Sequence, residues 1–227
     1  MIENWKRVLY FGAHPDDEII GAGGTLARCS AQGAEITVVT FTLGGTSYTS
    51  PEAKAEMKAV RAREAAAVEP ILGISRRIML NKPCQGVVND RETYQECVRI
   101  IREVRPDVIL THSYIDRHRD HRAVAEVTDG ARYKAAENVL ADLGEPWYTQ
   151  LLYHYEVIEL FPNPTLLIDI TDTMGKKLEA MATQESQMDV MPGVMEYIKA
   201  LGRVRGYQRK TLYAEAFFRS SFFPSLG

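Results

Sequence analysis

Short apolar runs alternate along the chain with longer segments in which apolar residues recur at helical spacing. Strands are predicted where the runs are rich in β-branched and aromatic residues: 7–13, 35–41, 77–80, 107–111, 151–157 and 166–170. Helices are predicted at 19–32, 51–72, 91–104, 121–140 and 174–187, and the Gly/Ser/Thr-rich segment 43–50 predicts a loop. Strands joined by helices imply right-handed crossovers. The pattern therefore predicts one Rossmann-like α/β domain over residues 1–227, with a mostly parallel sheet flanked by helices.

Composition excludes several classes of protein. Lys and Arg number 27 against 30 Asp and Glu, a net charge of -3, so no basic excess points to nucleic acid or an anionic membrane. We expect no signal peptide and no membrane span, because the first apolar run is short and ends in acids. The three cysteines, Cys29, Cys84 and Cys97, are odd in number and irregularly spaced. They predict buried packing residues in a cytoplasmic protein rather than disulfides.

Polar residues crowd the end of the first predicted strand, where Ala13-His14-Pro15-Asp16-Asp17-Glu18 follows an apolar run. In open α/β sheets, ligands bind at the carboxyl ends of the strands. A solvated acidic turn is the plain alternative. Three neighbouring carboxylates repel one another unless a cation or a hydrogen-bond network neutralises them, so the set with a histidine favours a cation site.

A second polar cluster follows the strand predicted at 107–111. Its segment 111–122 holds three of the five histidines, His112, His118 and His121, interleaved with Asp116 and Asp120. Zinc hydrolases commonly use three ligands of the His, Asp or Glu type and leave one position for water. His14, Asp17 and His121 can supply such a set.

These two clusters resemble the zinc-dependent de-N-acetylases of the PIG-L/LmbE type, which remove acetyl groups from N-acetylglucosamine conjugates. The resemblance rests on Ala-His-Pro-Asp-Asp-Glu after the first strand and on Asp-Arg-His-Arg-Asp-His at 116–121. It continues through segments 21–27, 61–64, 186–187 and 213–217, so it spans about 7–217. The Arg-His-x-Asp-His form is most similar to the branch that deacetylates N-acetylglucosaminyl-malate in bacillithiol synthesis. The implied substrate is a small amino-sugar conjugate.

The resemblance also implies roles for residues. His14, Asp17 and His121 are implied to hold one Zn²⁺ per chain, and Fe²⁺ or Co²⁺ suits such nitrogen and oxygen ligands as well. Asp16 is implied to be the general base. His118 is implied to stabilise the oxyanion or donate a proton, and we expect Asp120 to orient His118 and keep it charged.

Substrate contacts are predicted at Arg61, which matches the family's substrate-contacting arginine, and at Arg117. An arginine fork suits a carboxylate or sugar hydroxyls, whereas a surface ion pair is the alternative for each. Departures from the family pattern fall on the presumed substrate side of the site, because Gln85 and Gln184 stand about where the family often has Asp and His. His112 and His154 are expected to be structural, and Glu18 to support the metal site without binding the ion. Relatives are often trimers or hexamers, which implies a homo-oligomer.

Two other functions stay open on sequence alone. One is an amidase that acts on another small amide conjugate. The other is a nucleotide-binding module or methyltransferase, suggested by the Gly21-x-Gly23-Gly24 segment. That segment lacks the Gly-x-Gly-x-x-Gly spacing and follows the acidic cluster instead of the strand. The preferred interpretation is that these small residues let a helix approach the sheet closely.

Overall fold

Strand β1 (Arg7–Gly12) lies inside a seven-stranded sheet with the strand order β3-β2-β1-β4-β5-β7-β6. The computed structural model describes residues 2–222. Strands β1 to β5 pair in parallel, whereas β7 pairs antiparallel with both of its neighbours. The other strands are β2 (Glu35–Thr42), β3 (Arg76–Lys82), β4 (Val108–Thr111), β5 (Leu151–Tyr155), β6 (Leu166–Asp169) and β7 (Ala214–Arg219). The predicted fold class, α/β with a mostly parallel sheet, is confirmed.

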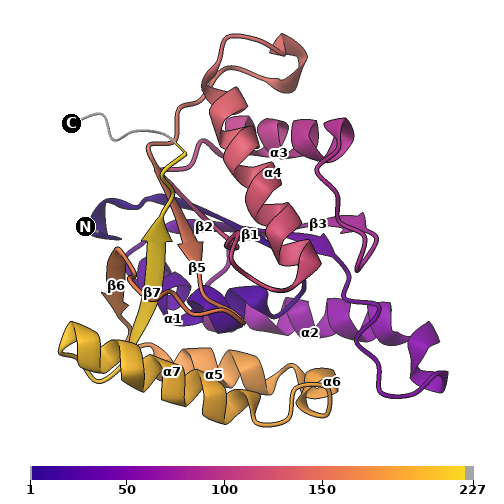
Figure 1. The fold of residues 1–227 in the computed structure, drawn as a ribbon, viewed down its shortest axis with the longest axis vertical. Helices are drawn as coiled ribbons and strands as arrows, with labels where there is room; N and C mark the ends of the chain where they lie inside the picture. Colours follow the sequence, from indigo (N-terminus) through magenta and orange to yellow (C-terminus); the bar gives the residue numbers. More distant parts are fainter. Residues whose placement is uncertain (1, 223–227) are drawn as a thin grey trace.

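Helices cover both faces of the sheet (Figure 1). One face carries α3 (Arg91–Val104) and α4 (Arg119–Ala136), and the other carries α1 (Asp17–Ala31), α2 (Met57–Leu72), α5 (Met174–Ala182) and α7 (Val194–Arg209). Because side chains alternate along a strand, β1 feeds both cores. Val8 and Tyr10 join the core under α1 and α5, whereas Leu9 and Phe11 join the core under α3 and α4. Parallel strands buried on both faces read as continuous apolar runs, as this sequence does.

Most predicted elements match observed ones within a few residues, but two predicted helices are divided and two elements near the C-terminus were not predicted. The helix predicted at 174–187 is divided into α5 and the short α6 (Glu185–Met188), and the one at 51–72 is divided into a 3₁₀ turn (Glu52–Ala55) and α2. Helix α7 and strand β7 had no predicted counterpart. Both bury charged residues in ion pairs, Arg205 with Glu156 and Glu215 with Lys177, which hides their apolar pattern.

The glycine-rich start of α1 packs tightly against neighbouring elements. A Cβ on Gly21 would lie 2.4 Å from the Tyr155 ring, and a Cβ on Gly24 would lie 2.7 Å from Ile170. Real side chains do not approach so closely, so these positions require glycine for close packing. The structure supports the packing interpretation of this segment over the nucleotide-binding one.

The chain changes direction within the sheet between β1 and β4. From β1 it builds outward through β2 and β3, and then returns to place β4 on the opposite side of β1. Such a switch point opens a crevice at the carboxyl ends of the two strands, where α/β proteins bind ligands. The turns after β1 and β4 carry the two polar clusters. No described helix is long and apolar enough to cross a membrane.

Candidate active site

The turn after β1 is built around an unusual backbone conformation at Asp16. Its φ is 137°, in a region that non-glycine residues rarely adopt and that costs about 1–3 kcal/mol. Asp16 precedes α1, and its carbonyl accepts hydrogen bonds from Ile19 N–H and Ile20 N–H (2.9 and 3.0 Å). His14 N–H donates to Asp17 Oδ2 (2.7 Å), which holds these two residues on the same side of the turn.

The turn after β4 presents His118 and His121 at the start of α4. His118 is the N-cap of this helix, and its Nδ1 accepts a hydrogen bond from Asp120 N–H (3.2 Å). Asp116 Oδ1 accepts a hydrogen bond from His118 N–H (2.8 Å). The His118 ring lies 4.5 Å from the His121 ring and 4.7 Å from the His14 ring, centroid to centroid. His118 and His121 therefore both face the site.

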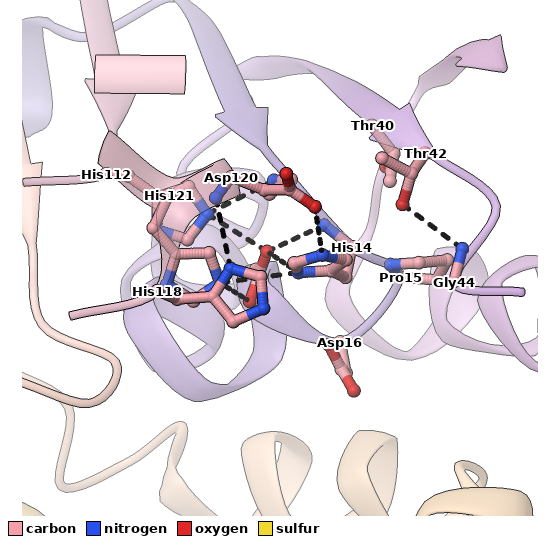
Figure 2. A network of polar contacts seen from close by, with 12 residues as sticks. His14, Pro15, Asp16, Thr40, Thr42, Gly44, His112, His118, Asp120 and His121 are labelled. Carbon is pink, nitrogen blue, oxygen red and sulfur yellow. Dashed lines mark hydrogen bonds and ion pairs between the residues drawn. The ribbon is translucent and has the colours of Figure 1, made fainter. Parts of the chain in front are cut away.

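The three predicted metal ligands lie close together, and Figure 2 shows His14 and His121 among them. His14 Nδ1 lies 3.3 Å from His121 Nε2, His14 Nδ1 lies 3.4 Å from Asp17 Oδ2, and His121 Nε2 lies 3.4 Å from Asp17 Oδ1. In a tetrahedral zinc site with bonds of about 2.0–2.1 Å, neighbouring ligand atoms stand about 3.3–3.4 Å apart. His14 Nδ1 and His121 Nε2 have this spacing, and the Asp17 carboxylate faces both of them, with Oδ2 toward His14 and Oδ1 toward His121. The donor types suit a divalent ion.

Each of the two predicted ligand histidines has a carboxylate beside the ring nitrogen that faces away from the other ligands. Asp120 Oδ2 lies 3.2 Å from His14 Nε2, and Asp116 Oδ2 lies 3.2 Å from His121 Nδ1. Such partners fix the orientation of a ligating imidazole and raise its basicity. The prediction that Asp120 orients His118 is therefore wrong. The Asp120 carboxylate contacts His14, and only its backbone N–H meets the His118 ring.

The electrostatics of this cluster favour positive charge. Burial alone lowers the pKa of His121, but Asp17 and Asp116 more than offset it and raise that pKa to about 9. The pKa of His14 is likewise raised well above its ordinary value, because Asp120 and Asp17 outweigh burial. Without an ion, protons supply the charge that these carboxylates favour. Metal binding requires the histidines to lose those protons.

His112 also belongs to this cluster, although the sequence indicated only a structural role. It is fully buried, its Nε2 lies 2.9 Å from Asp17 Oδ2, and its ring stacks on His121 at 3.8 Å. Burial lowers the pKa of His112 to about 4, so the ring is neutral. The available signal was its position directly after β4. His154 contacts the His112 carbonyl and Asp129, in keeping with the structural role expected of it.

Asp16 lies beside the three predicted ligands His14, Asp17 and His121, which we call the ligand triangle, and it pairs with a buried arginine. Arg61 Nη2 donates to Asp16 Oδ2 (2.9 Å) and to the Pro15 carbonyl. Burial raises the pKa of Asp16 to about 6, and Arg61 opposes that rise. Glu18 Oε2 accepts a hydrogen bond from Asp16 N–H (3.2 Å), and Glu18 also pairs with Arg77, so Glu18 supports the turn.

A cavity of about 170 Å³ opens over these groups. Its lining includes the three predicted ligands, together with Asp16, Arg61, Cys84, Gln85 and His118. Gln85 Nε2 lies 3.2 Å from His118 Nε2, and Gln85 N–H donates to Asp120 Oδ2 (2.7 Å). Cys84 is only partly buried and its Sγ lies 2.9 Å from Thr46 Oγ1, so the expectation of a buried residue is wrong for Cys84. Cys29 and Cys97 are fully buried.

Two other predicted positions lie outside this cavity. Arg117 is exposed, pairs with Glu159 and does not line this cavity. Gln184 is buried against the backbone of α2, where its Nε2 donates to the Glu64 carbonyl (3.0 Å). A larger cavity of about 460 Å³ is lined by Tyr114, Phe161 and other residues near β7. It shares no lining residue with the cavity over the predicted metal ligands.

Comparison with known families agrees with this geometry. The sequence profile described as PIG-L, GlcNAc-PI de-N-acetylase, matches residues 9–131, more than half of the 227 residues. The chain belongs to the PIG-L family. The matched region of this PIG-L chain contains the turns after β1 and β4, and therefore every residue of the ligand triangle.

Individual relatives of this PIG-L chain extend the comparison. A 1D-myo-inositol 2-acetamido-2-deoxy-alpha-D-glucopyranoside deacetylase from Rhodococcus erythropolis is 28% identical, over 87% of this chain and 86% of the relative. The solved structure of N,N'-diacetylchitobiose deacetylase from Pyrococcus horikoshii has a TM-score of 0.89 at 24% identity, covering 97% and 86% of the two chains. The structure of GalB, the 4-carboxy-2-hydroxymuconate hydratase from Pseudomonas putida, has a TM-score of 0.84 at 25% identity, covering 98% of each. Similar folds therefore include a hydratase as well as deacetylases.

Proposed function

We propose that this PIG-L chain is a metal-dependent hydrolase that removes the acetyl group from the amide nitrogen of an N-acetylglucosamine-type conjugate. The observation that carries the proposal is the triangle of His14, Asp17 and His121 beside the Asp16 carboxylate. The family profile and the inositol-conjugate deacetylase from Rhodococcus support the same reaction.

We propose one divalent ion per chain, most suitably Zn²⁺, held by His14, Asp17 and His121. Nitrogen and oxygen donors of this kind also accept Fe²⁺ or Co²⁺. Bound there, the ion would polarise the acetyl carbonyl and lower the pKa of water to about 7. Asp120 and Asp116 orient the two histidines, and the buried contact with His112 holds the Asp17 carboxylate.

Asp16 is the proposed general base. It is buried at the wall of the cavity, and a pKa of about 6 leaves it ionised yet basic enough to take a proton near neutral pH. Water adds to the acetyl carbonyl carbon as Asp16 removes its proton. The carbon–nitrogen bond then breaks, the nitrogen takes up the proton, and acetate and a free amine leave.

His118 is the proposed hydrogen-bond donor to the carbonyl oxygen. Because its Nδ1 accepts from Asp120 N–H, the neutral ring carries its proton on Nε2. Burial and the neighbouring His121 and His14 lower the pKa of His118, which favours this neutral form. A neutral Nε2–H can stabilise a developing oxyanion without a charged ring.

The finer parts of the proposal rest on the family resemblance. They are a small-molecule amino-sugar substrate and a trimeric or hexameric assembly. The proposed cytoplasmic location rests instead on the three irregularly spaced cysteines. Light scattering on the purified chain measures the assembly.

The decisive experiment measures acetate and free amine released from a panel of N-acetylated amino sugars by the purified protein, before and after chelation. We expect release that stops on chelation and returns when one equivalent of Zn²⁺ is added back. Undiminished release by metal-free protein would contradict the proposed metal role. Hydration of an unsaturated hydroxy acid with no acetate release would instead favour the chemistry of the GalB neighbour.

A further inference from the structure

The catalytic cavity continues into a second hollow on the same face of the molecule. This groove has a volume of about 290 Å³ and shares four lining residues with the catalytic cavity: Ile20, Val157, Ile158 and Met191. A molecule bound over the metal ligands can therefore extend directly into the groove.

The groove is apolar along its length. Beyond the shared residues it is lined by Pro192, Val194 and Tyr197, with Gly193 between the first two, and none of the described residues that line it is charged. The Tyr197 hydroxyl donates to the Val157 carbonyl (2.7 Å). The ring, and not the hydroxyl, is thus the part of Tyr197 left to meet a ligand.

The wall of the groove is hydrogen-bonded to a residue that contacts one of the proposed metal ligands. Ile158 N–H donates to Asp116 Oδ2 (3.3 Å), the same oxygen that lies 3.2 Å from His121 Nδ1. A group that packs on Ile158 therefore rests on the segment that positions a metal ligand. This continuity makes the groove part of the substrate site and not a separate surface feature.

The arginines of this region do not face the groove. Arg61 lines the catalytic cavity only, where it pairs with Asp16, and Arg117 pairs with Glu159. An anionic group such as malate would therefore lose its hydration in the groove without gaining a charged partner. An alkyl or aromatic group would gain from leaving water.

We infer that the groove binds the group attached to the amino sugar, and that this group is apolar. The inference rests on the proposed function, because the sugar must place its acetamide over the metal ligands for the attached group to enter the groove.

The test compares methyl, butyl and hexyl N-acetylglucosaminides with a carboxypentyl N-acetylglucosaminide, all below their micelle concentrations. We expect kcat/KM to rise about two- to fourfold for each methylene that the groove covers. The carboxypentyl compound should fall well below the hexyl one. Equal kcat/KM along the alkyl series, or a preference for the carboxylate, would overturn the inference.

Variants locate the effect in the groove. Ile158→Ser and Met191→Ser should each reduce the hexyl-to-methyl ratio of kcat/KM at least threefold, because each replaces apolar wall with a hydroxyl. Val204→Ser is the matched control, since Val204 is an exposed apolar residue of α7 that lines neither cavity. A ratio that the two groove variants leave unchanged would place the alkyl chain elsewhere and overturn the inference.

Binding separates this inference from the proposed function. If no glycoside releases acetate, the deacetylase proposal fails, and calorimetry with the Asp16→Asn protein still compares affinities for the hexyl and methyl compounds. Tighter binding of the hexyl compound, weakened by Ile158→Ser, supports an apolar ligand site. Equal affinities for both compounds would reject it.

Discussion

Asp120 Oδ2 lies 3.2 Å from His14 Nε2, on the side of the imidazole opposite the nitrogen that faces His121 and Asp17. Gln85 N–H and Val87 N–H donate to the two oxygens of the same carboxylate (2.7 and 3.2 Å). Asp120 is thus fixed by the loop after β3 and in turn fixes a ligand on the turn after β1. Three segments far apart in sequence meet at one histidine ring.

Metal affinity should depend on this carboxylate. Asp120→Asn should weaken Zn²⁺ binding about 10- to 100-fold, because the amide cannot hold the Nε2–H of His14 as strongly. Asp116→Asn should have a similar effect through His121. Competition with a chromophoric chelator measures both affinities. Glu159→Gln, which removes a surface partner of Arg117, is the control, and wild-type affinity in both Asp variants would refute the support role.

Asp16 and Asp17 are neighbours with separable roles. Asp16→Asn should retain the metal and lose about 10²–10⁴-fold in kcat, because the amide cannot accept a proton. Asp17→Asn should lower metal content instead. Elemental analysis beside acetate-release kinetics distinguishes the two. Metal loss in Asp16→Asn with retention in Asp17→Asn would require the roles to be exchanged.

His118 should act through the proton on its Nε2. His118→Ala should retain metal and lose about 10²–10³-fold in kcat, the usual scale for one oxyanion donor. His118→Gln, which keeps an N–H donor of similar reach, should recover part of that loss. Single-turnover acetate release by metal-loaded variants is the measurement. Equal activity in the alanine variant and the wild type would remove His118 from the chemistry.

The sequence predicted the layered fold because its inner strands are simple. β1, β2 and β4 are buried on both faces and contain almost only apolar or β-branched residues. β7 was not predicted because Glu215 interrupts its apolar pattern. The Glu215 carboxylate is buried against Lys177 and accepts hydrogen bonds from Gly24 N–H and Thr25 N–H on α1. A partner 190 residues away in sequence gives no local signal.

The ligand set could be predicted because its residues follow adjacent strands in two short motifs. The partners of these ligands could not, because spacing along the chain does not fix where a side chain turns. Asp120 is closer in sequence to His118, yet the N-cap geometry of α4 directs its carboxylate to His14. Arg117 likewise adjoins His118 but points to Glu159 on the surface.

Arg117 should be dispensable for activity. Arg117→Ala should change kcat/KM less than about twofold for any N-acetylglucosaminide, because its side chain forms an exposed ion pair with Glu159 of small energetic value. Steady-state kinetics on the methyl and carboxypentyl glycosides checks this. A selective loss on the carboxylated compound would return Arg117 to the substrate site.

Arg61 should help to determine the pH at which kcat/KM falls on the acid side of the pH profile. Burial raises the pKa of Asp16 to about 6, and the Arg61 guanidinium lowers it from a still higher value. A base works in its deprotonated form, so kcat/KM should fall as the pH drops through about 6. Arg61→Gln removes the opposing charge and should move this limb to higher pH, whereas Arg61→Lys should move it less. Arg63→Gln, on the exposed side of the same helix, is the control. Metal content is measured in each variant, so that a shifted limb is not mistaken for loss of the ion. A limb that stays in place or moves to lower pH in metal-loaded Arg61→Gln would show that another group, and not Asp16 beside Arg61, governs the acid side.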